Sequence, residues 1–127
     1  MAKAIEDSTV QETVKKIEHI INDNPDPIQG VQAVYQYDIP DEDYSFQLHL
    51  NDGKAEVRED FAERGDCTII ISYPNFKKML FGKLNGTAAF MMGKLKVKGD
   101  IGKALKAEAL LGQYDMEAEF GNWRLSK

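Results

Sequence analysis

Residues 82–99 read GKLNGTAAFMMGKLKVKG, and the interpretation of this stretch decides the fold. It contains Gly-Lys-Leu twice, eleven positions apart, with four glycines near four lysines. Glycine beside lysine is typical of phosphate-binding loops, in which bare backbone N–H groups surround the phosphate. The alternative is that the glycines end short helices and strands, and that the apolar residues between them carry the function.

The spacing excludes the phosphate loop. Such a loop has four residues between its first glycine and its Gly-Lys pair, followed by Ser or Thr for magnesium. Here six residues separate Gly86 from Gly93, and Leu95 follows Lys94. A phenylalanine and two methionines would fill the loop. We therefore interpret the glycines as the ends of short structural elements.

Composition indicates one ordinary globular domain spanning residues 1–127. The apolar share is 43% and the charged share 29%, and a chain of this length buries roughly two-thirds of its unfolded surface. The net charge of -5 argues against nucleic-acid binding, which relies on Lys and Arg. The lone Cys67 allows no intrachain disulfide or Cys-based zinc cluster. Since neither a signal peptide nor an apolar run of about 20 residues is found, we expect a cytoplasmic protein.

The first half of the chain predicts one helix and then a run of strands. Residues 8–22 have apolar side chains at helical spacing, with Ser8 and Gln11 as a capping box. Four segments alternate or are β-branched, and Asn51-Asp52-Gly53 predicts a hairpin between the second and third. The predicted strands are residues 31–39, 44–51, 54–60 and 67–73.

The second half predicts short helices around one more strand. Pro74 suits the first turn of a helix that Gly82 ends, and a second short helix covers residues 85–92. Leu95 and Val97, with lysines between them, form a strand. Asp100 is the expected N-cap of a last helix, which Gly112 closes.

No catalytic or metal-binding constellation is predicted. His19 and His49 lack metal-ligand spacing and are expected at the surface. Cys67 begins a buried strand, where cysteine usually behaves as a small hydrophobe. An enzyme that depends on Cys67 is kept as a weak alternative. The segment from residue 76 to 111 holds three Phe and three Met, which suit either an irregular core or an adaptable cavity.

Three motifs together resemble the sterol carrier protein 2 family. They are DCTIIIS at residues 66–72, FGKLN at 81–85 and AFMMGKLKVKGD at 89–100. The joined pattern is far more specific than its pieces. The resemblance is close over about residues 66–111 and looser over the N-terminal helix and strands. The tail around Phe120 and Trp123 has no counterpart in the family pattern.

The resemblance implies an α/β (α+β) fold: a five-stranded, mixed, mostly antiparallel sheet, with about five helices on one face enclosing an apolar tunnel. It implies a non-enzymatic protein that binds or transfers a sterol, fatty acid, fatty acyl-CoA or phospholipid. No thiolase or dehydrogenase segment precedes the motifs, so we expect a stand-alone domain, and we expect neither a cofactor nor a metal. Six residues of the matching motif are implied in the tunnel wall, and three from the preceding apolar segment are added. The predicted ligand-binding residues are Phe76, Leu80, Leu84, Phe90, Met91, Leu95, Val97, Ile101 and Leu105.

Two further readings stay open. Lys94, Lys96 and Lys98 form either a solvated strand face or a surface that touches anionic membranes or an acyl-CoA phosphate. The apolar surface could instead serve self-dimerisation or an accessory role beside a lipid-metabolising enzyme. The sequence names neither the lipid nor the oligomeric state.

Overall fold

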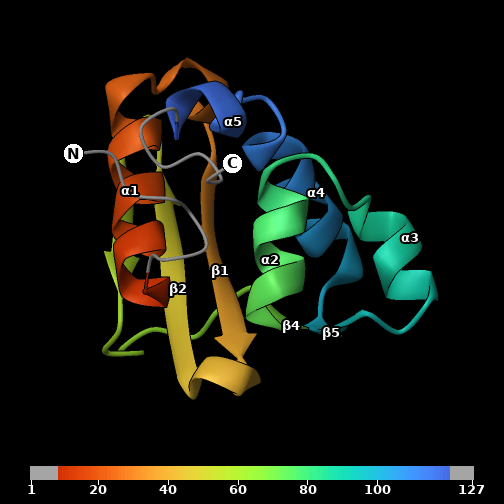
Figure 1. Ribbon diagram of the computed structural model, residues 1–127. Coiled ribbons are helices and arrows are strands. Elements are labelled where there is room, and N and C mark those ends of the chain that lie inside the picture. The colour runs from red at the N-terminus through yellow and green to blue at the C-terminus, as the bar shows by residue number, and fades with distance from the viewer. Residues whose placement is uncertain (1–8, 121–127) are drawn as a thin grey trace.

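The computed structural model describes residues 9–120, in which helices cover one face of a five-stranded sheet (Figure 1). The strands are β1 (Gln32–Ile39), β2 (Tyr44–Asn51), β3 (Ala55–Arg58), β4 (Cys67–Ile71) and β5 (Leu95–Gly99). The α-helices are α1 (Val10–Asp23), α2 (Tyr73–Leu80), α3 (Gly86–Met91), α4 (Ile101–Leu111) and the single turn α5 (Met116–Glu119). Two 3₁₀ turns, η2 (Asp26–Ile28) and η3 (Pro40–Glu42), flank β1.

The sheet is mixed and mostly antiparallel, as predicted. Its order is β3-β2-β1-β4-β5, and only the β1–β4 pair is parallel, with Tyr35 opposite Cys67. The predicted hairpin joins β2 to β3, with Asp52 and Gly53 at φ 46° and 88°. Positive φ at both central residues matches the right-handed twist of the strands, which explains the Asp-Gly pair.

The two faces of the sheet differ because the strand sequences alternate. Along β1, Tyr35 and Tyr37 are buried on the face against which α1, α2 and α4 pack. On the opposite face, Gln47 is buried because the loop after β3 covers it, and its Nε2 donates to the Glu63 carbonyl at 2.8 Å. His49 was expected at the surface, but its ring lies beside Gln47 and Glu63, and its side chain is only 11% exposed.

Helix α1 begins one residue later than the predicted capping box. The N-cap is Thr9, whose Oγ1 accepts from Glu12 N–H at 3.1 Å, while Glu12 Oε1 accepts from Thr9 N–H at 2.9 Å. The box is therefore formed by Thr9 and Glu12 and not by the predicted pair of Ser8 and Gln11, of which Ser8 lies outside the described residues. Either glutamate or glutamine can close such a box, but glutamate also places negative charge at the positive end of the helix.

Helices α2 and α3 end in the same way. Gly82 N–H donates to the carbonyl three positions back at 3.1 Å, and Lys83 N–H donates to the one five positions back at 2.8 Å. Gly93 and Lys94 repeat both bonds after α3, at 3.2 and 2.8 Å. This is the Schellman motif, and the glycines adopt φ 73° and 75°. Each of the two Gly-Lys-Leu copies therefore marks the end of a helix, the first after α2 and the second after α3.

Candidate functional site

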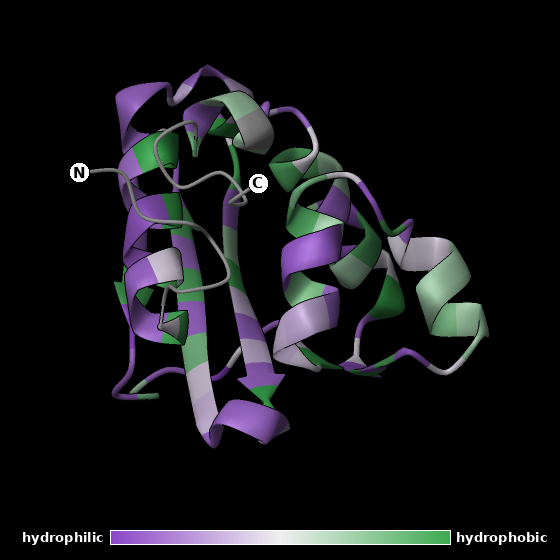
Figure 2. Ribbon diagram, in the orientation of Figure 1, coloured by the Kyte–Doolittle hydropathy of each residue, from purple (hydrophilic) through white to green (hydrophobic). Residues whose placement is uncertain are grey.

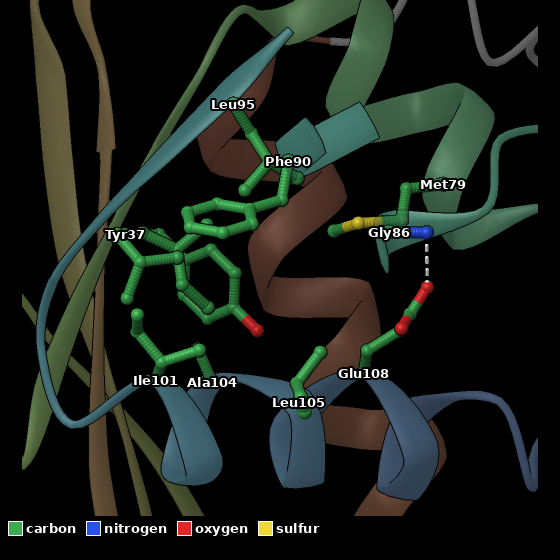
Figure 3. Close-up of a pocket in the computed structure, with 11 residues that line it drawn as sticks. Tyr37, Met79, Gly86, Phe90, Leu95, Ile101, Ala104, Leu105 and Glu108 are labelled. Atoms are coloured by element: carbon green, nitrogen blue, oxygen red, sulfur yellow. Dashed lines mark hydrogen bonds between the residues drawn. The ribbon is translucent and has the colours of Figure 1, made fainter. Parts of the chain in front are cut away.

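A small apolar hollow, here called the inner cavity, lies between the sheet and helices α3 and α4 (Figure 3). Its volume is about 30 Å³, room for no more than one or two waters. Strands β1, β4 and β5 form its floor. The lining residues are Tyr37, Ile69, Met79, Gly86, Phe90, Leu95, Val97, Ile101, Ala104, Leu105 and Glu108.

A larger hollow of about 330 Å³, here called the outer groove, runs between α2 and the end of α4. Met79 and Glu108 line both hollows, so these two side chains lie where the cavity and the groove adjoin. The groove is lined by Phe76, Met79, Leu80, Gly82, Leu84, Asn85, Glu108, Ala109, Leu111 and Gly112.

The structure distributes the nine predicted residues over three places. Five line the inner cavity, namely Phe90, Leu95, Val97, Ile101 and Leu105. Three line the outer groove, namely Phe76, Leu80 and Leu84. Met91 lines neither hollow, and 80% of it is exposed, because it is the last residue of a short helix and points outward. That these residues bind ligand stays a prediction.

Several lining residues were not predicted. Tyr37 and Ile69 are register partners across the parallel β1–β4 pair, and Ile69 in turn faces Val97. Alternation in β1 and β4 puts each of these two residues on one face of its strand. It could not show which helices cover them, because that depends on the strand order. Ala104 and Glu108 lie one turn apart on α4.

Glu108 ties α4 to the start of α3. Its carboxylate accepts a hydrogen bond from the Gly86 backbone N–H. A Cβ at position 86 would overlap this carboxylate, so a larger residue there would displace the Glu108 side chain. Glu108 is thereby fixed at the boundary between the inner cavity and the outer groove.

The other polar group of the inner cavity is the phenol of Tyr37. The residue is 1% exposed, and its Oη has no hydrogen-bond partner within residues 9–120. Burial raises the pKa of this phenol well above its ordinary range, and nearby Cys67, Tyr35 and Glu108 add to the rise. Tyr37 is therefore a neutral hydrogen-bonding group at any physiological pH.

Apolar side chains are also exposed around the mouth of the cavity. Figure 2 shows hydrophobic residues along α3, which lies at the outer edge of the molecule. The exposed large apolar residues here are Phe90, Met91, Met92, Ile101 and Leu105. Such clusters mark surfaces that contact another molecule.

Reactive groups are poorly placed for catalysis. Cys67 is buried, and burial, followed by the charges of Asp66 and Asp100, raises the pKa of its thiol. A raised pKa keeps the thiol protonated, whereas the nucleophile is the thiolate. Within residues 9–120, no group of three or more His, Cys, Asp or Glu side chains is placed to hold a metal ion.

Comparison with known proteins agrees with this architecture. The sequence matches the SCP-2 sterol transfer family over residues 12–112. It is 39% identical over 114 residues to hydroxysteroid dehydrogenase-like protein 2 of Xenopus tropicalis and 31% identical over 106 residues to sterol carrier protein 2 of Rattus norvegicus. These alignments cover 88% and 83% of this chain but only 27% and 19% of the relatives.

A solved structure shows the same fold. The sterol carrier protein domain 2 of Helicoverpa armigera superposes with a TM-score of 0.69 at 28% identity. The superposition covers 91% of this chain and 95% of that domain. Because the family match spans most of its length, the chain belongs to the SCP-2 sterol transfer family.

Proposed function

We propose that the protein binds a lipid between the sheet and helices α3 and α4, and carries it without chemical change. Family membership supports lipid binding, and the apolar inner cavity with its adjoining groove supports the location. The candidate ligands are a sterol, a fatty acid, a fatty acyl-CoA or a phospholipid. The buried, protonated Cys67 supports a role without catalysis.

Binding requires the inner cavity to widen. About 30 Å³ cannot hold a lipid, but Met79 and Glu108 also line the adjoining groove of about 330 Å³, so a shift of these two side chains would widen the cavity toward the groove. Met79 is unbranched and adapts easily. Each buried CH₂ contributes about 0.8 kcal/mol, so a chain of about 16 carbons supplies ample affinity even after the costs of association.

Native mass spectrometry of the purified protein, with extraction of co-purifying lipid, tests this function. We expect a lipid adduct, and binding of a fluorescent fatty acid or sterol to the delipidated protein. Leu105→Glu and Phe90→Glu each place a charge in the cavity lining and should weaken binding at least about tenfold. Met91→Glu is the matched control, since Met91 lines neither hollow. Circular dichroism checks that each variant folds. Absence of both adduct and probe binding would exclude the carrier function.

We also propose a transient contact with anionic membranes through the exposed end of α3. Lys94, Lys96 and Lys98 are exposed and follow directly after the apolar residues of this helix. Within residues 9–120, none of the helices has the length and apolar character needed to cross a membrane. Sedimentation with vesicles containing phosphatidylserine should recover more protein than with phosphatidylcholine alone, and changing the three lysines to glutamine should remove the difference. Equal recovery would exclude this contact.

A second candidate use of the same exposed residues is self-association or docking to an enzyme that acts on lipids. The exposure of Met91 and Met92 favours it, and a relative named as a dehydrogenase-like protein contains a region matched by this chain. Light scattering with and without fatty acid separates the two uses. A dimer that persists when lipid is bound supports association, and a monomer in both conditions excludes self-association. The cytoplasmic location and the stand-alone organisation stay predictions.

A further inference from the structure

Among the residues that the structure describes, the buried hydroxyl of Tyr37 has no hydrogen-bond partner. Buried polar groups in proteins are nearly always hydrogen-bonded, because leaving one unpaired costs stability. A pair of buried hydroxyls in this protein follows the rule: Thr13 Oγ1 lies 2.6 Å from Tyr73 Oη. Within residues 9–120, Tyr37 Oη makes no such bond.

The ring of Tyr37 is held so that its hydroxyl points into the inner cavity. It stacks on Phe46 with ring centroids 5.1 Å apart and planes 9° from parallel, and it meets the edge of Phe76 at 5.7 Å. These contacts leave the ring little freedom to swing toward another partner. Figure 3 shows the hydroxyl directed into the space between Phe90 and Leu105.

The charges around the cavity disfavour an anionic group at this position. Among the described residues that line it, none is a lysine or an arginine, and Glu108 is the one acidic residue. A carboxylate beside Tyr37 would lie near the Glu108 carboxylate in an apolar surrounding, where like charges repel strongly. A hydroxyl or carbonyl group avoids this repulsion and satisfies the phenol.

We infer that Tyr37 Oη hydrogen-bonds an uncharged polar group of the bound lipid, which therefore enters with that group innermost, and that the site selects a hydroxylated lipid over a fatty acid. This inference rests on the proposed lipid-binding function. It assigns Tyr37 as the residue that hydrogen-bonds the polar end of the ligand. Glu108 is the residue that weakens binding of a carboxylate, by charge repulsion.

The test compares three probes that share a pyrene-labelled decyl chain and end in a hydroxyl, a carboxylate or a methyl group. The delipidated wild-type protein should bind the alcohol most tightly. Tyr37→Phe removes one oxygen without changing shape, and should weaken binding of the alcohol about tenfold, the effect of losing one hydrogen bond. Its affinity for the methyl-terminated probe should stay unchanged. Glu108→Gln should strengthen binding of the carboxylate probe alone.

Tyr35→Phe is the matched control. Tyr35 lies two residues away on the same face of β1, and its Oη also lacks a partner within residues 9–120. It lines a different hollow of about 10 Å³ beneath α1, together with Ile21 and Ile28. The change at Tyr35 should leave the affinities for all three probes as they are.

Three results would overturn the inference while leaving the carrier function intact. One is that Tyr37→Phe binds the alcohol as tightly as the wild type. Another is that Tyr37→Phe changes all three affinities equally, which would mean that the hydroxyl binds only a buried water. A wild-type preference for the carboxylate probe would also overturn it. If no probe binds the wild type although a lipid co-purifies with it, the inference fails and the carrier function stands. If neither is observed, the carrier function fails as well.

Discussion

At the scale of single residues, the hydroxyl groups of two buried tyrosines affect the stability of the fold in opposite directions. Tyr73 Oη lies 2.6 Å from Thr13 Oγ1, and Thr13 is fully buried. Tyr37 Oη is equally buried but has no partner within residues 9–120. The same chemical change, from tyrosine to phenylalanine, therefore removes a satisfied group in one case and an unsatisfied group in the other.

Tyr37→Phe should raise the free energy of unfolding of the lipid-free protein by about 1 kcal/mol, because an unpaired polar atom leaves the core. Tyr73→Phe should lower it by about 1–2 kcal/mol, because the Thr13 hydroxyl stays buried without its partner. Urea unfolding followed by circular dichroism measures both changes. A loss of stability in Tyr37→Phe would show that the lipid-free protein already satisfies this hydroxyl.

Alkaline pH should unfold the protein through its buried phenols. Burial, and then the charges of Cys67 and Asp66, raises the pKa of Tyr35 from 10.0 to about 12. The folded state holds this proton more tightly than the unfolded chain does. The stabilisation that comes from the protonated Tyr35 phenol is thus complete below pH 10, and it is lost as the pH rises from about 10 through 12. Absorbance at 295 nm and circular dichroism should change together, and Tyr35→Phe should unfold at higher pH. Ionisation of all tyrosines near pH 10 with intact secondary structure would contradict this.

At the scale of elements, the ends of the short helices depend on glycine to different degrees. Gly93 follows α3 at φ 75°, whereas Gly112 caps α4 at φ -68°. A side chain is strained at the first angle and ordinary at the second. Gly93→Ala should therefore lower the free energy of unfolding by about 1 kcal/mol, while Gly112→Ala should change it by less than about 0.5 kcal/mol. Thermal unfolding measures both, and equal effects would mean that α3 does not need its left-handed end.

The elements that the sequence predicted best are those with a strict local pattern. The alternation in β1 and β2, the Asp-Gly turn and the Asp100 N-cap are all found where expected. Strand β3 is shorter than predicted, since pairing with β2 ends at Arg58. Helix α5 was not predicted, because four residues are too few for a periodic signal.

The candidate site was only partly predictable, because it is assembled from segments far apart in the chain. The motif supplied Phe90, Leu95 and Leu105, which are close in sequence. Tyr37 and Glu108 come from β1 and α4, and only the parallel β1–β4 pair brings them to one cavity. Met91 was predicted inside by its place in the motif, but a six-residue helix buries only part of its circumference.

At the scale of the whole molecule, the two hollows exist only when sheet and helices are assembled. A lipid that binds there has no comparable site on the unfolded chain, so its binding energy adds to the stability of the fold. At a free lipid concentration about one hundred times Kd, the gain should be about 2.7 kcal/mol. Calorimetry should show a melting temperature that rises with added lipid for the wild type and much less for Leu105→Glu. No rise at saturating lipid would indicate that the lipid binds elsewhere, or also binds the unfolded chain.

The small volume of the inner cavity bears on how fast a lipid can bind and leave. Since about 30 Å³ leaves no room for a hydrocarbon tail, a lipid can enter only after the side chains or helices around the cavity have moved. If that movement precedes binding, the observed rate of loading in a stopped-flow experiment should level off as lipid is added. The plateau is then the opening rate of the protein, and the same step limits how soon a bound lipid is released. Under the proposed function, the time for which a lipid stays bound would then be set by this movement of the protein and not by the source of the lipid.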